Sequence, residues 1–284
     1  MGFSPRACMF ALLGLSMVFP VSAGQLETGQ PTQSEVLQTK AWGILWDGAH
    51  ADDAAKRSKA IHALGLLYPY PEVVQLTEGA LKDPQPDVRS AAAIALGEMH
   101  STASIAKLEK ALSDKDVSVA LAAGRSLLLL KNESGYDIYY AVLTGKRKTG
   151  ESLMTQELNQ LDTPKKAAEF AFDQGVGFVP YAGYGIDVIN ALTKNRDGSP
   201  VRAAAARALA SDPDPRSGQA LVRACSDKNW IVRAAALQAI AERGNPSLAP
   251  QIKLEMSDSD DIVRYTAAAA VLRLTWIGQT DRSK

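Results

Sequence analysis

One short stretch of sequence recurs along this chain at a fixed spacing, and this recurrence limits the fold more than any other feature. Two gapless pairs begin at Asp83 and Asp114 and at Asp227 and Asp258, and the members of each pair are 31 residues apart. A fifth copy ends at Leu209, and a weaker one ends at Leu64. Because one such unit is too short to enclose a core, we expect the units to stack on one another.

Each copy places a valine, a small residue and an aliphatic residue at spacings of three, four and eight, which line up on one face of a helix. A strand is excluded because no alternation of period two is present. Alanine on that face lets neighbouring helices approach closely. The repeated positions are Val88, Val119, Val201, Val232 and Val263, then Ala91, Ala122, Ala204 and Ala235, then Leu96, Leu127, Leu209, Ile240 and Val271.

A second helical pattern precedes each of these copies, so the expected unit is a pair of helices. Pro215 and Pro246 stand where such helices would begin, which suits the preference of proline for the first helical turn. The apolar positions of this second helical pattern are Leu108, Leu221 and Ile252 in one row and Leu81, Leu112, Cys225 and Met256 in another.

An aspartate stands six residues before an arginine in several units, and this feature resembles the HEAT-like repeats. The matching pairs are Asp83 and Arg89, Asp227 and Arg233, and Asp258 and Arg264. The short period is similar to that of the phycobilisome-lyase-like HEAT group, and the resemblance covers about residues 50–130 and 198–275. It implies an all-α fold, a right-handed, armadillo-like α-solenoid, in which these pairs form a ladder of hydrogen bonds. Ala120 replaces the arginine in one copy, and Asp197 is one residue out of register in another.

Composition argues against a nucleic-acid partner. Basic and acidic residues both number 31, so the net charge is zero, and the basic residues are spread along the chain. Binding to nucleic acid requires a concentrated basic surface. Aromatic residues make up only 6% of the chain, and much of the apolar share is alanine, which favours packed helices.

The first residues have the pattern of a secretory signal. Arg6 precedes an apolar run from Ala7 to Phe19, and small residues follow at 21–23. The run is too short to span about 30 Å of hydrocarbon as a stable anchor, although an uncleaved anchor is the alternative. We therefore expect a signal peptide at 1–23, a flexible leader at 24–33 and an exported protein, periplasmic or extracellular, of the bacterial envelope. The mature chain would keep one cysteine, Cys225.

The middle of the chain breaks the period. Val119 and Val201 are 82 residues apart, which is not a multiple of 31. We expect a helix over 134–145, another over 163–172, and an irregular or degenerate segment at 146–197. A glycine-rich stretch at 174–185 carries Phe178, Tyr181 and Tyr184. It is interpreted as a tight turn, a partner contact or a membrane-surface contact.

The two repeat blocks are expected at 34–145 and 198–278, with a tail at 279–284. Thr32 and Glu35 form a capping-box pattern that predicts a helix over about 33–46. Trp42 and Trp46 are one turn apart on it, and we expect them, with Trp276 at the other end, to close the ends of the stack.

The sequence contains no recognisable catalytic or metal-binding set. His50, His62 and His100 form no histidine–glutamate pairs, and Cys225 shares a core position with leucine and methionine. We therefore expect no cofactor and no enzymatic activity, and a scaffold that binds a protein partner. The candidate surface, expected on the inner helices, comprises Lys107, Lys110, Arg223 and Lys253. The alternatives are membrane docking through 174–185 and a lyase-like enzyme, the latter by fold analogy alone.

Overall fold

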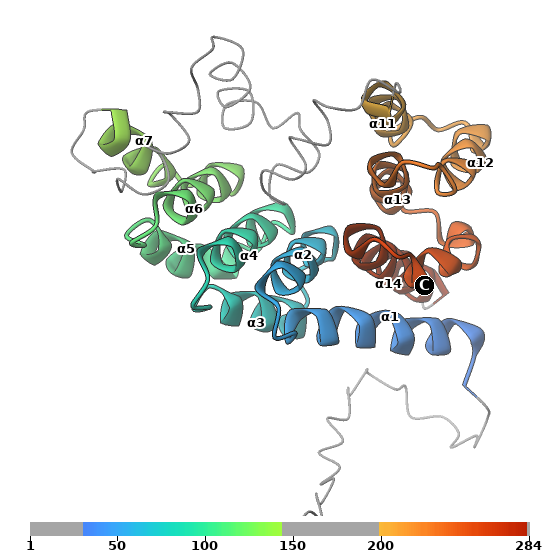
Figure 1. Ribbon diagram of the computed structural model, residues 1–284, viewed down its shortest axis with the longest axis horizontal. Helices are drawn as coiled ribbons and strands as arrows, with labels where there is room; N and C mark the ends of the chain where they lie inside the picture. Colours follow the sequence, from blue (N-terminus) through green and yellow to red (C-terminus); the bar gives the residue numbers. More distant parts are fainter. Residues whose placement is uncertain (1–30, 144–198, 283–284) are drawn as a thin grey trace, which may run out of the picture.

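The computed structural model describes residues 31–143 and 199–282, and all regular structure within these two ranges is helical. The expected signal peptide, most of the leader, the helix over 163–172 and the glycine-rich stretch with Phe178, Tyr181 and Tyr184 lie outside the described residues. Two blocks of helices follow in chain order (Figure 1).

The N-terminal block pairs its helices as the sequence predicts. Thr32 and Glu35 form the capping box that starts the first helix. The elements are α1 (Gln33–Ala49), α2 (Ala54–Ala63), η1 (Leu64–Leu66), α3 (Pro71–Ala80), α4 (Pro86–Glu98), η2 (Thr102–Ser104), α5 (Ile105–Ala111), α6 (Val117–Leu129) and α7 (Gly135–Leu143). The helix expected over 134–145 is thus present as α7.

The C-terminal block contains α11 (Ser199–Ala208), α12 (Pro215–Ala224), α13 (Trp230–Arg243), η4 (Pro246–Gln251), η5 (Lys253–Ser257) and α14 (Asp261–Arg282). One predicted helix differs, because residues 246–257 form two short 3-10 segments in place of an α-helix. Pro250 lies inside this stretch. A proline there lacks the N–H of an α-helical hydrogen bond and clashes with the preceding turn.

The second helix of each unit forms the inner layer of the stack. Helices α2, α4 and α6 pack on one another, and so do α11, α13 and α14. Alanines at one repeated position of these helices, Ala92, Ala123, Ala236 and Ala267, are all 0% exposed. Figure 1 shows α3, α5 and α12 on the outer side of the arc. Close contact between alanine-rich inner helices therefore sets the spacing of the units.

The repeated valine position is buried in four of the inner helices, as the alignment of the repeats predicts, and exposed in α11. Val88, Val119, Val232 and Val263 are at most 2% exposed, whereas Val201 of α11 is 73% exposed. Within the described part of its block, no helix precedes α11, so this side of it has no described neighbour.

The last helix of the chain packs against the first two helices. α14 contacts α1, α2 and η1, so the inner helices follow the spatial order α11, α13, α14, α2, α4, α6 (Figure 1). We call the contact of α14 with α1, α2 and the turn 64–70 the seam. Because of the seam, Trp42, Trp46 and Trp276 lie near the middle of the stack, and the expectation that they close its ends is wrong.

The seam also explains a difference at the C-terminus. Residues from 279 onward were expected to form a tail, but α14 continues to Arg282. The Gln279 side-chain amide donates to the Gln38 side chain of α1 at 3.4 Å, so the last turns of α14 lie along the first helix.

Candidate partner-binding surface

A ladder of arginine–aspartate pairs joins successive units within each block. Each arginine lies on a second helix, and the aspartate lies in the turn before the second helix of the next unit. The Nε–Oδ2 distances are 2.8 Å for Arg57–Asp83, 2.8 Å for Arg89–Asp114, 2.9 Å for Arg202–Asp227 and 2.8 Å for Arg233–Asp258. A second guanidinium nitrogen donates to the other carboxylate oxygen, so each pair is bidentate.

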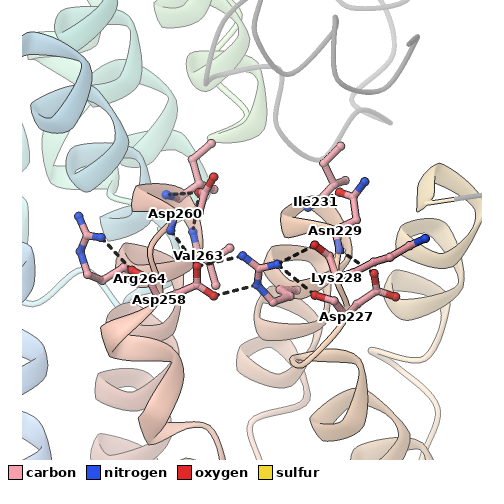
Figure 2. Close-up of polar contacts among 10 residues, drawn as sticks. Asp227, Lys228, Asn229, Ile231, Asp258, Asp260, Val263 and Arg264 are labelled. Atoms are coloured by element: carbon pink, nitrogen blue, oxygen red, sulfur yellow. Dashed lines mark hydrogen bonds and ion pairs between the residues drawn. The ribbon is translucent and has the colours of Figure 1, made fainter. Parts of the chain in front are cut away.

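The same side chains also hold the turn within a unit. Nη1 of Arg89 donates to the Asp83 carbonyl at 2.9 Å, and Nη1 of Arg233 donates to the Asp227 carbonyl at 3.0 Å. Asp258 in turn accepts from the amide of Asp260 at 2.8 Å. Figure 2 shows Asp227 and Asp258 in neighbouring turns, with Arg264 beside Asp258. The ladder therefore fixes both the shape of each turn and the spacing between units.

Electrostatics favour the charged form of the ladder. Burial pushes the pKa of Asp83 upward, but the hydrogen bonds from Arg57 and the Gln85 amide prevail and hold it below its usual value. Asp114 behaves in the same way, with Arg89 and the Asp116 amide as its partners. The hydrogen bond from Arg89 to Asp114 likewise raises the pKa of the Arg89 guanidinium above its usual value.

All six ladder residues expected from the sequence take part in these contacts, but the pairing differs from the six-residue spacing. Within a unit the arginine binds the aspartate's backbone carbonyl, and the ion pairs of Arg89 and Arg233 are with the aspartate of the following unit. Arg264 binds the Asp258 carbonyl in the same way, but its ion pair is with Asp261 of its own helix. Arg57, Asp114 and Arg202 were missed as members. The signal for them was present, since Arg57 lies 32 residues before Arg89, and Asp114 lies 31 residues after Asp83.

One position of the second helices presents a half-buried side chain in five units. These residues, which we call the inner row, are His62, Ile94, Arg125, Arg207 and Gln238. Burial lowers the pKa of His62, the charge of Glu98 opposes this shift, and Arg125 adds to it. Charges on α2, α4 and α6 are therefore close enough to interact. In α14 the same position is Ala269, which is 0% exposed at the seam.

The cationic residues expected on the inner helices lie instead on the first elements of their units. Lys107 and Lys110 belong to α5, Arg223 to α12 and Lys253 to η5. Figure 1 places α5 and α12 on the outer side. All four are exposed, and Lys107 pairs with Glu78. The sequence pattern could not tell inner from outer helices, because both carry an apolar stripe.

Reactive and metal-binding groups are sparse in the described part of the chain. Cys225 is 2% exposed, and burial raises the pKa of its thiol to about 12, so this thiol is a poor nucleophile. Residues 31–143 and 199–282 contain no group of three or more His, Cys, Asp or Glu side chains placed to hold a metal ion. None of the helices within these ranges has the length and apolarity needed to cross a membrane.

The repeat pattern matches an established family. The family model described as HEAT repeats matches residues 45–128 and 187–272, which together are more than half of the chain. The chain belongs to the HEAT repeat family. No curated protein matches this HEAT repeat protein.

Two solved structures show a similar helical arrangement at low similarity scores. One is the complex of CpcE and CpcF of phycocyanin lyase from Nostoc sp. PCC7120, at 21% identity, covering 89% of this chain and 99% of that chain with a TM-score of 0.31. The other is human deoxyhypusine hydroxylase in complex with glycerol, at 15% identity, covering 85% of this chain and 98% of that chain with a TM-score of 0.32. Neither likeness bears on the activity of this HEAT repeat protein.

Proposed function

We propose that this HEAT repeat protein is an exported scaffold that binds a protein partner along its inner row. The observation that carries the proposal is the unbroken order of inner helices, which runs through both blocks across the seam. Stacked repeats create extended binding surfaces of this kind. The pattern of residues 1–23 supports export, and a bacterial envelope is the compartment that such a signal fits.

Three features support the inner row as the binding surface. Its side chains are half-buried, so they are held in place and still accessible. The helices that carry them are locked by the ladder, which lowers the entropic cost of binding. Two of its five members are arginines, and arginine is enriched at the centres of protein interfaces.

The experiment is crosslinking capture of the tagged full-length chain from its native envelope, with partners identified by mass spectrometry. We compare the wild type with the double variant Arg125→Glu/Arg207→Glu on the inner row. The matched control, Lys110→Glu/Arg223→Glu, makes the same change in charge on the outer side. Circular dichroism checks that both variants keep the helical content of the wild type.

We expect one protein to be enriched by the wild type and the outer control and lost with the inner variant. Loss with the outer control alone would move the binding surface to the first helices. No enriched protein in any form would overturn the scaffold proposal. Intact mass of the purified protein tests export separately, because a chain that begins at Gly24 is expected, and one that keeps Met1 contradicts cleavage.

A further inference from the structure

One arginine at the seam binds both blocks. Nη1 of Arg273 in α14 donates to the carbonyl of Leu66 at 2.6 Å, and its Nε donates to the carbonyl of Ala241 at 3.0 Å. Leu66 belongs to the N-terminal block, and Ala241 belongs to α13. The Arg273 guanidinium also lies 4.5 Å from the centre of the Tyr68 ring, within range of a cation–π interaction.

Aromatic side chains extend this contact. Tyr70, in the turn before α3, packs edge-on against Trp276 of α14, with ring centres 4.6 Å apart. Tyr68 and Tyr70 are themselves edge-on at 6.3 Å. Such aromatic pairs stabilise a contact beyond the apolar area that they bury. A more distant ion pair, Lys59 with Asp261 at 3.9 Å, lies at the same junction.

Close packing continues beneath these side chains. A Cβ atom added to Gly48 of α1 would lie 2.5 Å from Cε1 of Tyr265 in α14 and 2.7 Å from Cβ of Ala60 in α2. Tyr265 is 4% exposed, and the buried residues of both blocks form a single apolar cluster. The core is therefore continuous across the seam, as it is between units inside a block.

The composition of the seam is that of an interface between separate proteins. Tyrosine, tryptophan and arginine are enriched at such interfaces and supply most of their binding energy. The ladder, by contrast, is absent here. The first unit has Ala51 at the position of the ladder aspartate, and Arg264 pairs with Asp261 of its own helix.

We propose that the contacts between the described helices of the two blocks, most of them at the seam, hold the blocks in one particle, so that the protein stays assembled when the chain is cut between α7 and α11. The surface of α1, α2 and the turn 64–70 is then a docking site whose partner is α14 of the same chain. The covalent link between α7 and α11 keeps the local concentration of the two blocks high, and under this proposal their contact persists after the link is cut. A second copy competes poorly at ordinary protein concentrations for the same reason.

The test uses the full chain with the recognition sequence of a specific protease inserted between Lys148 and Thr149. After complete cleavage, size-exclusion chromatography with light scattering measures the mass of the particle under native conditions. We expect the two fragments to elute together at the mass of the uncut monomer, with unchanged circular dichroism. Fragments that separate, or that unfold on cutting, would overturn the proposal.

A second pair of variants tests which contact holds the fragments. In the cut protein, Arg273→Ala is expected to raise the dissociation constant at least tenfold, since it removes the hydrogen bonds to the Leu66 and Ala241 carbonyls and the contact with Tyr68. Arg223→Ala removes an exposed arginine away from the seam and serves as the control, with an expected change below twofold. Equal effects of the two substitutions would show that the Arg273 contacts do not hold the seam.

Discussion

Junctions inside the two blocks and the seam between them are built from different side chains. Inside a block, inner helices meet through alanines, and a bidentate arginine–aspartate pair, which forms one rung of the ladder, joins each two neighbouring units that are described. At the seam, α14 meets the turn 64–70 through tyrosine, tryptophan and one arginine that binds carbonyl oxygens, and Tyr265 of α14 packs against Gly48 of α1. The junctions inside a block repeat, and an arginine–aspartate pair determines how each helix lies on the next. The seam occurs once among the described residues, and the close fit of its side chains determines how α14 lies on the N-terminal block.

This difference separates two tasks, the spacing of neighbouring units and the choice of which helix lies next to which. Ladder rungs are interchangeable, so they fix the distance between neighbours without distinguishing one unit from another. The seam contacts occur once among the described residues, so they select α14 as the neighbour of α2. Specificity of this kind depends on contacts that wrong pairings cannot reproduce.

The largest expected effect comes from removing a buried rung. Arg89→Ala leaves the Asp114 carboxylate without its cation in a site where the Arg89 side chain is only 7% exposed. Removing one partner of a buried ion pair costs about 3–5 kcal/mol. Urea unfolding followed by circular dichroism measures the change. The control, Arg202→Ala, removes a rung whose arginine side chain is 38% exposed, and we expect about 1 kcal/mol or less. Equal losses at both positions would contradict a role for burial in the ladder.

The second prediction disrupts the seam and leaves the ladder intact, by placing a bulky residue at Gly48. Gly48→Val puts atoms within contact of the Tyr265 ring and Ala60, and overpacking of this kind costs about 1–3 kcal/mol. Unfolding in urea measures it. Gly43 lies on the same helix with nothing within 4 Å of an added Cβ, so Gly43→Ala is expected to be neutral or stabilising by up to about 1 kcal/mol. If Gly48→Val lowers the free energy of unfolding no more than Gly43→Ala does, the close approach of α1 and α14 is contradicted.

Removing one ring tests the aromatic part of the seam. Trp276→Leu keeps apolar bulk but removes the edge-on contact with Tyr70, and we expect a loss of about 1 kcal/mol. A double-mutant cycle with Tyr70→Leu isolates this contact, because only the coupled part of the two losses belongs to it. Additive losses would show that the two rings stabilise the protein independently.

Acid should weaken the ladder and leave the seam contacts of Arg273 in place, because those contacts use carbonyl oxygens. Asp83 and Asp114 have pKa values below the usual value near 4, so their contribution is present above that pH and is lost as the pH falls through their folded-state pKa values. We expect the stability gap between the wild type and Asp114→Asn to narrow as the pH is lowered from about 5 to about 2. Thermal unfolding at several pH values measures this gap, and a constant gap would exclude the ladder as its source.

The repeated junctions could be predicted from sequence, and the seam could not. A 31-residue period located the paired helices and the ladder residues, because each junction copies the previous one. Pairing of each arginine with the aspartate of the next unit needed the structure, although the spacing of Arg57 and Asp114 already marked them as members. The broken helix at 246–257 could have been anticipated from Pro250.

Seam residues gave no comparable signal. Arg273, Tyr68 and Tyr70 occur once, without a copy elsewhere in the chain to reveal their role. Trp42, Trp46 and Trp276 were assigned to the ends of the stack because a linear array was assumed. The inner row was missed since its members differ in chemistry from unit to unit, and only the half-buried position that they share identifies them.

The spatial order of the units also determines where such a molecule can grow. In a linear array, new units are added most easily at the chain termini, where the stack is open. Here the ends of the described part meet at Gln38 and Gln279, and the outermost of the described inner helices, α6 and α11, belong to the interior of the sequence. Duplication of a unit would therefore be tolerated best by insertion in the middle of the gene. Joining the two ends of the described part and opening the chain between α7 and α11 would give a linear array in which the described helices keep the same packing.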